Sequence, residues 1–138
     1  MIVLDTNVIS AVMRGDDAAS NFLDQVDDPW MSVTTITEIS YGLHRLPEGR
    51  RRESLDEHWR NTLEVWHNRI LPITPNIAGL SGAVMAQRER IGQPVALADA
   101  QIAATCLAHD AAIATGNTRD FEHLGLTIIN PWLDTVES

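Results

Sequence analysis

The sequence contains no lysine, a single cysteine and no long run of apolar residues. Cys106 alone can form neither an internal disulfide nor a zinc site built from several thiolates. Residues 1–4 are apolar, but no basic segment accompanies them and Asp5 follows at once, so we expect neither a signal peptide nor a membrane span. These absences predict a cytoplasmic protein that is stabilised by packing.

Positive charge is also scarce, because ten arginines stand against 19 acidic residues and the formal net charge is -9. This balance argues against a broad basic face that binds nucleic acid through many phosphates. It does not exclude a nuclease, since a bound cation reverses the local field of an acidic site. The length of 138 residues and the hydrophobic fraction of 44% indicate one globular domain over residues 1–138.

Short apolar runs alternate with segments of helical periodicity along the chain. The expected strands are residues 2–4, 30–33, 70–73, 111–114 and 126–129. The expected helices are residues 6–13, 18–26, 35–46, 48–68, 75–91, 95–109 and 118–124, with caps expected at Thr6 or Asn7 and at Thr34 or Thr35. This βα alternation predicts an α/β fold, a parallel sheet of about five strands covered by helices on both faces.

Four acidic side chains stand where these elements begin or end. Asp5 directly follows the first strand, Glu38 lies in the first turn of the helix after the second, and Asp120 comes soon after the fourth. Asp99 lies in the first turns of the helix expected over 95–109. In such a sheet the ligand site lies at the carboxyl ends of the strands, near the point where the strand order reverses. The sequence therefore predicts that the four carboxylates share one site.

Carboxylate oxygens are the ligands that Mg²⁺ and Mn²⁺ prefer, usually beside several waters and a substrate phosphate. We expect Asp5 and Asp99 to bind such an ion directly, because each is expected to be partly buried, where an unpaired charge is costly. Glu38 and Asp120 would complete the ring or act through water. The neutral side chains expected to bind a water or a phosphate oxygen are Thr6, Thr115 and Asn117.

Each acid also has a structural interpretation when it is taken alone. Asp5 could cap the following helix. Glu38 and Asp99, in first turns, could complement a helix dipole. Asp120 could be a solvated surface acid. The joint placement of the four acids at strand ends is what favours a functional site.

Five sequence blocks resemble those of a known family in order and spacing. They are VLDTNVIS at 3–10, SVTTITEISYG at 32–42, ADAQIAA at 98–104, ATGNTRDF at 114–121 and INPW at 129–132. The chain resembles the PIN-domain ribonucleases, specifically the VapC-type toxins of bacterial toxin-antitoxin pairs in the FitB-like subgroup. The resemblance spans nearly the whole chain.

The resemblance implies a three-layer α/β/α PIN domain with Asp5, Glu38, Asp99 and Asp120 as its acidic quartet. It implies Mg²⁺- or Mn²⁺-dependent endoribonuclease activity on cellular RNA. Asn117 lies near a position that is often Asp in the family, which leaves a second metal ion without an expected ligand.

The resemblance also implies partners. They are a second copy of the chain in a homodimer and a cognate VapB-type antitoxin that blocks the acidic pocket in a hetero-oligomer. An apolar helical stripe is expected either in the core, in a dimer face or in the antitoxin groove; its members are Leu55, Trp59, Leu63 and Trp66.

Two other functional classes compete with this interpretation. Aspartyl-phosphate phosphatases and receiver domains also begin with an apolar strand that ends in Asp. They typically use a lysine near the phosphate, and such phosphatases carry a second Asp where this chain has Asn7. A degenerate PIN module could bind RNA or a protein without catalysis, but retention of all four acids argues against it.

Overall fold

The structure is a computed structural model that describes residues 1–134. The strands are β1 (Ile2–Leu4), β2 (Pro29–Ser32), β3 (Ile70–Leu71), β4 (Ala112–Ala114) and β5 (Ile128–Ile129). The helices are α1 (Thr6–Met13), α2 (Asp17–Gln25), α3 (Val33–His44), α4 (Arg50–Trp66), α5 (Pro75–Arg90), α6 (Leu97–His109) and the 3-10 helix η1 (Thr118–Phe121). Every expected strand and helix is present, although several are shorter and the last helix is a single 3-10 turn.

All five strands run parallel in one sheet of order β3-β2-β1-β4-β5. From β1 the chain adds strands outward to β2 and β3, and it then returns to the other side of β1 to add β4 and β5. The strand order therefore reverses between β1 and β4. Their carboxyl ends form the crevice in which α/β folds of this kind bind ligands.

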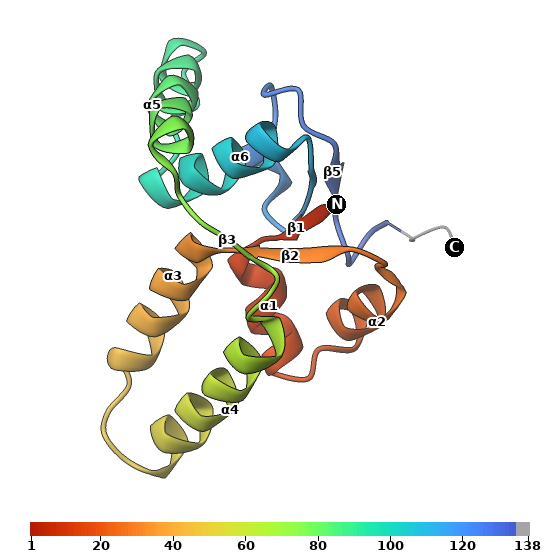
Figure 1. Cartoon of the computed structure of the whole chain (residues 1–138), viewed down its shortest axis with the longest axis vertical. Coiled ribbons are helices and arrows are strands. Elements are labelled where there is room, and N and C mark those ends of the chain that lie inside the picture. The colour runs from red at the N-terminus through yellow and green to blue at the C-terminus, as the bar shows by residue number, and fades with distance from the viewer. Residues whose placement is uncertain (135–138) are drawn as a thin grey trace.

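Two layers of helices cover the sheet, as Figure 1 shows with α1, α2, α3 and α4 on one side and α5 and α6 on the other. Successive side chains of β1 point to opposite faces, as in any strand. Leu4 packs in the core beside α1 to α4, and Val3 packs in the core beside α5 and α6. The predicted three-layer α/β/α architecture is confirmed.

The apolar stripe of α4 belongs to the first of these cores. Trp59 and Trp66 are buried, with 3% and 9% of their surface exposed, and Leu55 and Leu63 pack against the same cluster. Of the predicted roles of this stripe, packing in the core is therefore the one confirmed.

Two helix caps differ from the prediction. Asp5 caps α1 by accepting a hydrogen bond from the backbone N of Thr6 at 2.8 Å, and Ser32 caps α3 by accepting one from the backbone N of Thr34 at 3.1 Å. Caps at Thr6, Asn7, Thr34 or Thr35 were wrong because each helix begins directly after its strand, which makes the last extended residue the cap. Because α3 begins at Val33, Glu38 lies in its second turn, and the predicted placement of Glu38 in the first turn was also wrong.

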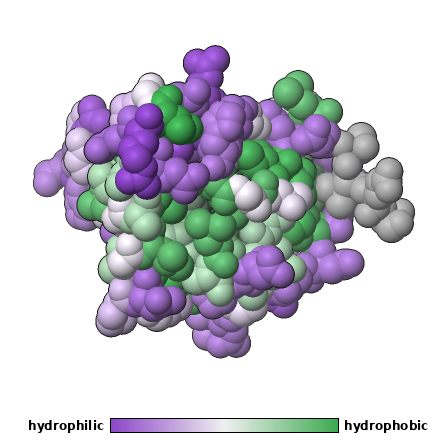
Figure 2. Space-filling view, turned by 90° about the horizontal axis from the view of Figure 1, so that it is seen from above, coloured by the Kyte–Doolittle hydropathy of each residue, from purple (hydrophilic) through white to green (hydrophobic). Residues whose placement is uncertain are grey.

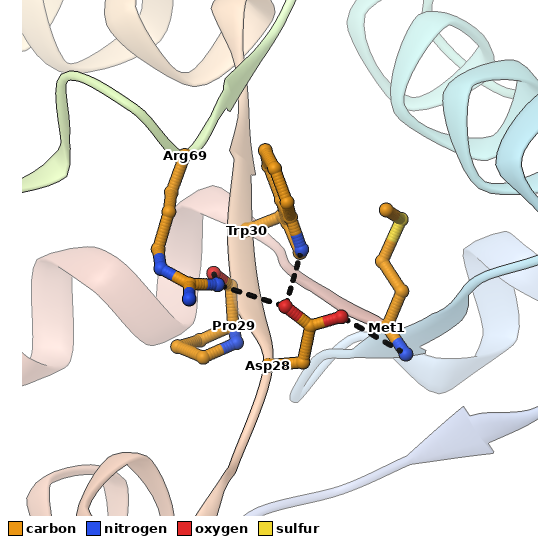
Figure 3. A network of polar contacts seen from close by, with 5 residues as sticks. All are labelled: Met1, Asp28, Pro29, Trp30 and Arg69. Atoms are coloured by element: carbon orange, nitrogen blue, oxygen red, sulfur yellow. Dashed lines mark hydrogen bonds and ion pairs between the residues drawn. The ribbon is translucent and has the colours of Figure 1, made fainter.

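A network of paired charges lies at the amino ends of the strands, opposite the crevice at their carboxyl ends (Figure 3). The carboxylate of Asp28 accepts hydrogen bonds from Arg69 Nη1 at 2.8 Å and Trp30 Nε1 at 2.9 Å, and it lies 3.6 Å from the amino group of Met1. The hydrogen bonds from Arg69 and Trp30 lower the pKa of Asp28 below its usual range. The negative charge of Asp28 is thus balanced by Arg69 and by the amino group of Met1.

The face seen from above in Figure 2, on the side that α5 and α6 cover, is apolar in its middle and hydrophilic along its edges. Apolar side chains with large exposed fractions on these two helices and their connection include Ile91 at 45% and Leu97 at 56%. Within residues 1–134, no helix has both the length and the apolar character needed to cross a bilayer.

Candidate active site

Asp5 occupies the switch point between β1 and β4, and only 3% of its surface is exposed. One carboxylate oxygen, Oδ1, accepts the hydrogen bond from the backbone N of Thr6 that caps α1. The other, Oδ2, accepts from Thr115 Oγ1 at 2.8 Å and from Asn7 Nδ2 at 3.0 Å. The structural and functional interpretations of Asp5 are therefore compatible, because the cap also fixes the carboxylate at the site.

Glu38 reaches the same site from α3. Thr6 Oγ1 donates a hydrogen bond to Glu38 Oε1 at 2.6 Å and lies 3.0 Å from Thr35 Oγ1. The hydroxyl of Thr6 thus joins the start of α1 to the second turn of α3. Through Thr6, the two acids Asp5 and Glu38 share one hydrogen-bonded network.

Asn7 connects β1 to the loop after β4. Its Oδ1 accepts a hydrogen bond from the backbone N of Gly116 at 3.0 Å, while its Nδ2 donates to Asp5 and, at 3.2 Å, to Thr115 Oγ1. The sequence had suggested only a capping role for Asn7. The signal that could have revealed this link is its place two residues after the strand-ending Asp5, where polar side chains face the crevice.

Asp99 and Asp120 are half-buried and lie at the same site, on α6 and η1. Among residues 1–134, no hydrogen bond or ion pair joins either carboxylate to another side chain or to the backbone. The ion pairs within this part of the chain involve only Asp28 and Asp56 as the acids. No arginine of this part therefore neutralises the quartet.

Burial, and after it the charges of neighbouring acids, raises the pKa values of two members of the quartet. Burial raises the pKa of Asp99 from 3.8 to about 6, and the negative charges of the other three acids, Asp5, Asp120 and Glu38, add to the shift. Burial also raises the pKa of Asp5, against the hydrogen bonds from Thr115 and Thr6 that favour its ionised form. The charges of Glu38 and Asp120 contribute to the raised pKa of both Asp5 and Asp99, so the four acids lie near one another.

The remaining predicted residues differ in their roles. Thr115 is fully buried and holds Asp5, as described above, and its Oγ1 also accepts a hydrogen bond from the backbone N of Asn117 at 2.9 Å. Asn117 itself is exposed, and among the described residues its side chain makes no hydrogen bond. Cys106 is buried in the core between α6 and the sheet, and burial raises the pKa of its thiol to about 12, so it remains protonated.

The donor set fits a hard divalent cation. It offers four carboxylates, and none of them forms an ion pair with an arginine of residues 1–134. A bound divalent cation would therefore relieve the repulsion between these negative charges. Among residues 1–134, however, no three acidic, histidine or cysteine side chains already stand close enough to hold one ion together. Binding therefore requires side-chain rotation, which Asp99 and Asp120 can make without breaking a hydrogen bond to the described residues.

Gly116 lies against Trp132, a contact that the sequence did not predict. A Cβ atom at Gly116 would stand 2.9 Å from Cζ3 of Trp132 and 3.2 Å from its Cε3. The indole is held by a hydrogen bond from its Nε1 to Asp16 Oδ1 at 3.1 Å. The residue at position 116 must therefore be small.

We expect Gly116→Ala to lower the free energy of unfolding by about 1 kcal/mol, because the indole of Trp132 must shift and weaken its hydrogen bond to Asp16. The matched control is Gly82→Ala in α5, where a Cβ meets no atom within 4 Å. That variant should instead stabilise the protein by about 0.5–1 kcal/mol, because alanine loses less backbone entropy in a helix. Urea denaturation measures both, and equal effects of the two substitutions would contradict the close packing of Trp132.

Comparison with known proteins identifies the family. A family model described as PIN domain matches residues 2–126. VapC ribonuclease Y4jK from Sinorhizobium fredii is 36% identical over 137 residues, which are 96% of this chain and 98% of that protein. Toxin FitB from Neisseria gonorrhoeae is 32% identical over 97% of this chain and 100% of its own length.

A solved structure extends the similarity to three dimensions. The crystal structure of FitAcB from Neisseria gonorrhoeae matches with a TM-score of 0.87 and 31% sequence identity, over 96% of this chain and 99% of that one. The fold, the site at the switch point and the sequence relatives lead to one conclusion. The chain belongs to the PIN-domain family.

Proposed function

We propose that this protein is an endoribonuclease that depends on Mg²⁺ or Mn²⁺ and acts in the cytoplasm as the toxin of a toxin-antitoxin pair. The observation that carries the proposal is the convergence of four uncompensated carboxylates at the switch point of the sheet. The relatives named VapC ribonuclease and toxin FitB support the reaction class and the biological role.

The proposed ligands are the carboxylates of Asp5, Asp99, Glu38 and Asp120. A bound divalent cation would supply Lewis-acid activation of the scissile phosphate and of the attacking water. Asp5 contributes the most rigid carboxylate, because Thr115 and Asn7 hold one of its oxygens and the α1 cap holds the other. Thr6 orients Glu38 through its hydroxyl.

Polar groups beside the acids are proposed to bind the RNA backbone. Thr6 and Thr115 supply hydroxyls whose positions are fixed by the site, and Asn117 supplies an exposed amide on the loop after β4. A neutral amide at 117 suits a phosphate oxygen better than a carboxylate does, because it adds no further negative charge to the quartet.

A groove beside the acids supports an antitoxin as inhibitor. It has a volume of about 260 Å³, and it is lined by Thr6 and Glu38 at one end and by apolar side chains of α1, α3 and α4, among them Ile39, Leu43 and Leu55. A VapB-type antitoxin segment lying in this groove would place its end at the carboxylates. An arginine there could pair with them in bidentate geometry and compete with the metal ion.

We also propose a homodimer, in addition to the hetero-oligomer with the antitoxin. The apolar middle of the face in Figure 2 supports such an interface, because large exposed apolar patches usually mark contact surfaces. Light scattering of the antitoxin-free protein measures the mass directly.

Expression of the protein alone is expected to arrest bacterial growth, and co-expression of the cognate antitoxin should restore it. Sequencing of RNA ends after induction should reveal new ends at a limited set of sites in the wild type and none with Asp99→Asn. Growth arrest without new RNA ends would contradict the ribonuclease proposal. It would favour instead a PIN module that binds RNA or a protein without catalysis.

A further inference from the structure

The four acids of the site are held in two different ways. Asp5 and Glu38 are fixed directly, because neighbouring hydroxyl, amide and backbone groups donate hydrogen bonds to their carboxylates. Asp99 and Asp120 receive no such bond from the described residues. These two side chains can rotate, so the places that their carboxylates can reach depend on the backbone positions of α6 and η1 and on the contacts that join those two segments.

Arg88, near the end of α5, is buried with 2% of its surface exposed. All of its side-chain hydrogen bonds within residues 1–134 go to backbone carbonyls rather than to a carboxylate. Its Nε donates to the oxygen of Gln93 at 2.8 Å, its Nη1 to that of Glu122 at 2.7 Å and its Nη2 to that of Arg119 at 3.1 Å. Burial of a guanidinium costs free energy, and the hydrogen bonds to these carbonyl oxygens offset that cost.

Two of these carbonyls belong to the segment that carries Asp120, and the third belongs to the connection that leads from α5 to the helix of Asp99. Arg119 and Glu122 stand on either side of Asp120, one residue before it and two residues after it. Gln93 lies in the connection from α5 to α6, six residues before Asp99. One planar guanidinium therefore ties both segments to the same helix end.

The neighbouring residue of α5 reinforces this attachment. Gln87 Nε2 donates a hydrogen bond to the backbone oxygen of His123 at 2.8 Å. His123 has a φ angle of 65°, a left-handed conformation that few non-glycine residues adopt. The segment after Asp120 is thus held in a specific shape by the end of α5.

We propose that Arg88 is a positioning residue for the metal site. Its guanidinium fixes the segment of Asp120 against the connection that leads to Asp99, and so limits the separation of the two backbone positions from which these carboxylates reach an ion. This inference rests on the proposed metal-dependent function, and it assigns a role in that function to a side chain that does not belong to the acidic quartet.

The test compares Arg88→Met with Arg90→Met, a matched change at an exposed arginine of the same helix. Calorimetry with Mn²⁺ is expected to give a dissociation constant raised roughly 10- to 100-fold for Arg88→Met, the range typical of groups that orient metal ligands. The kcat for RNA cleavage should fall by a similar factor, and KM should change less, because the hydroxyls of Thr6 and Thr115 proposed to bind the RNA are held by Glu38 and Asp5 rather than by Arg88. Arg90→Met should match the wild type in all three quantities.

Two milder variants keep the test decisive if Arg88→Met does not fold. Arg88→Lys keeps the charge but lacks the planar fork that reaches three carbonyls, and Gln87→Leu removes one bond to the same segment. Each should weaken Mn²⁺ binding measurably relative to Arg90→Met, at temperatures well below the melting point found for each variant.

The outcomes separate the inference from the proposal on which it rests. Variants at 88 and 87 that melt earlier but bind Mn²⁺ and turn over RNA like the wild type would show a purely structural role and overturn the inference alone. A wild-type protein that neither binds Mn²⁺ nor cleaves RNA would overturn the proposed function, and with it this role of Arg88.

Discussion

Asp99→Asn is expected to stabilise the metal-free protein and, at the same time, to abolish RNA cleavage. The pKa of Asp99 rises from 3.8 to about 6 because the carboxyl is half-buried beside three other acids. The ionised form is thus unfavourable in the folded state at neutral pH. After a discount for the exposed part of the side chain, removing this charge should raise the free energy of unfolding by about 1 kcal/mol.

The pH dependence of this stabilisation provides its control. A folded-state pKa above the unfolded value means that the folded protein holds more protons, so the contribution of Asp99 to stability falls as pH rises. The difference between Asp99→Asn and the wild type should be near zero below about pH 4, grow between about pH 4 and 6, and remain constant above. Urea denaturation at several pH values measures it, and a variant less stable than the wild type at pH 7 would contradict the electrostatic account.

The same substitution removes a proposed ligand, so cleavage should fall by at least about 100-fold, more than is usual for groups outside the ligand set. The control is Asp24→Asn, at an exposed acid of α2. That variant should cleave RNA like the wild type. Opposite signs for stability and activity distinguish a functional carboxylate from a structural one, since loss of a structural carboxylate would lower both.

Asp5→Asn is expected to remove the stabilisation that Mn²⁺ gives to the fold, as well as RNA cleavage. At 100 times its dissociation constant, a ligand that binds only the folded state stabilises it by about 2.7 kcal/mol. The asparagine keeps an oxygen that can accept the cap bond from Thr6, but it lacks the negative charge at the switch point. Thermal melts with and without Mn²⁺ should therefore show a rise in melting temperature for the wild type and little change for Asp5→Asn.

Asp24→Asn again serves as the control and should keep the full response to Mn²⁺. A rise in melting temperature of Asp5→Asn equal to that of the wild type would mean that the ion binds elsewhere. In that case the assignment of Asp5 as a ligand would be wrong.

The sheet and the shared acidic site could be predicted from sequence because both depend on local patterns. The apolar run of residues 2–4 ending in Asp5 predicts a buried strand with an acid at its carboxyl end, and parallel strands bring such ends to one edge. The alternation of apolar runs and helical segments was sufficient to predict a parallel sheet covered by helices. The sheet order confirms the predicted sheet, and the charges of the neighbouring acids raise the pKa values of Asp5 and Asp99 beyond the effect of burial.

The connections within the site depend on side-chain geometry that no spacing reveals. Asn7 lies 109 residues before Gly116 in sequence, yet the two form a hydrogen bond at 3.0 Å. The periodicity of α5 places Arg88 on the same stripe as Ile77 and Val84, which hints at burial. Its acceptors, however, are backbone carbonyls, which every residue possesses, so the sequence carries no sign of which ones they are.

The most direct test of the account is RNA cleavage by the purified protein, freed of antitoxin, with and without a divalent cation. We predict cleavage with Mg²⁺ or Mn²⁺, none with EDTA, and recovery when the ion is restored in excess. Cleavage that survives EDTA, or that persists unchanged in Asp5→Asn and Asp99→Asn, would contradict a metal-dependent site built from these four acids.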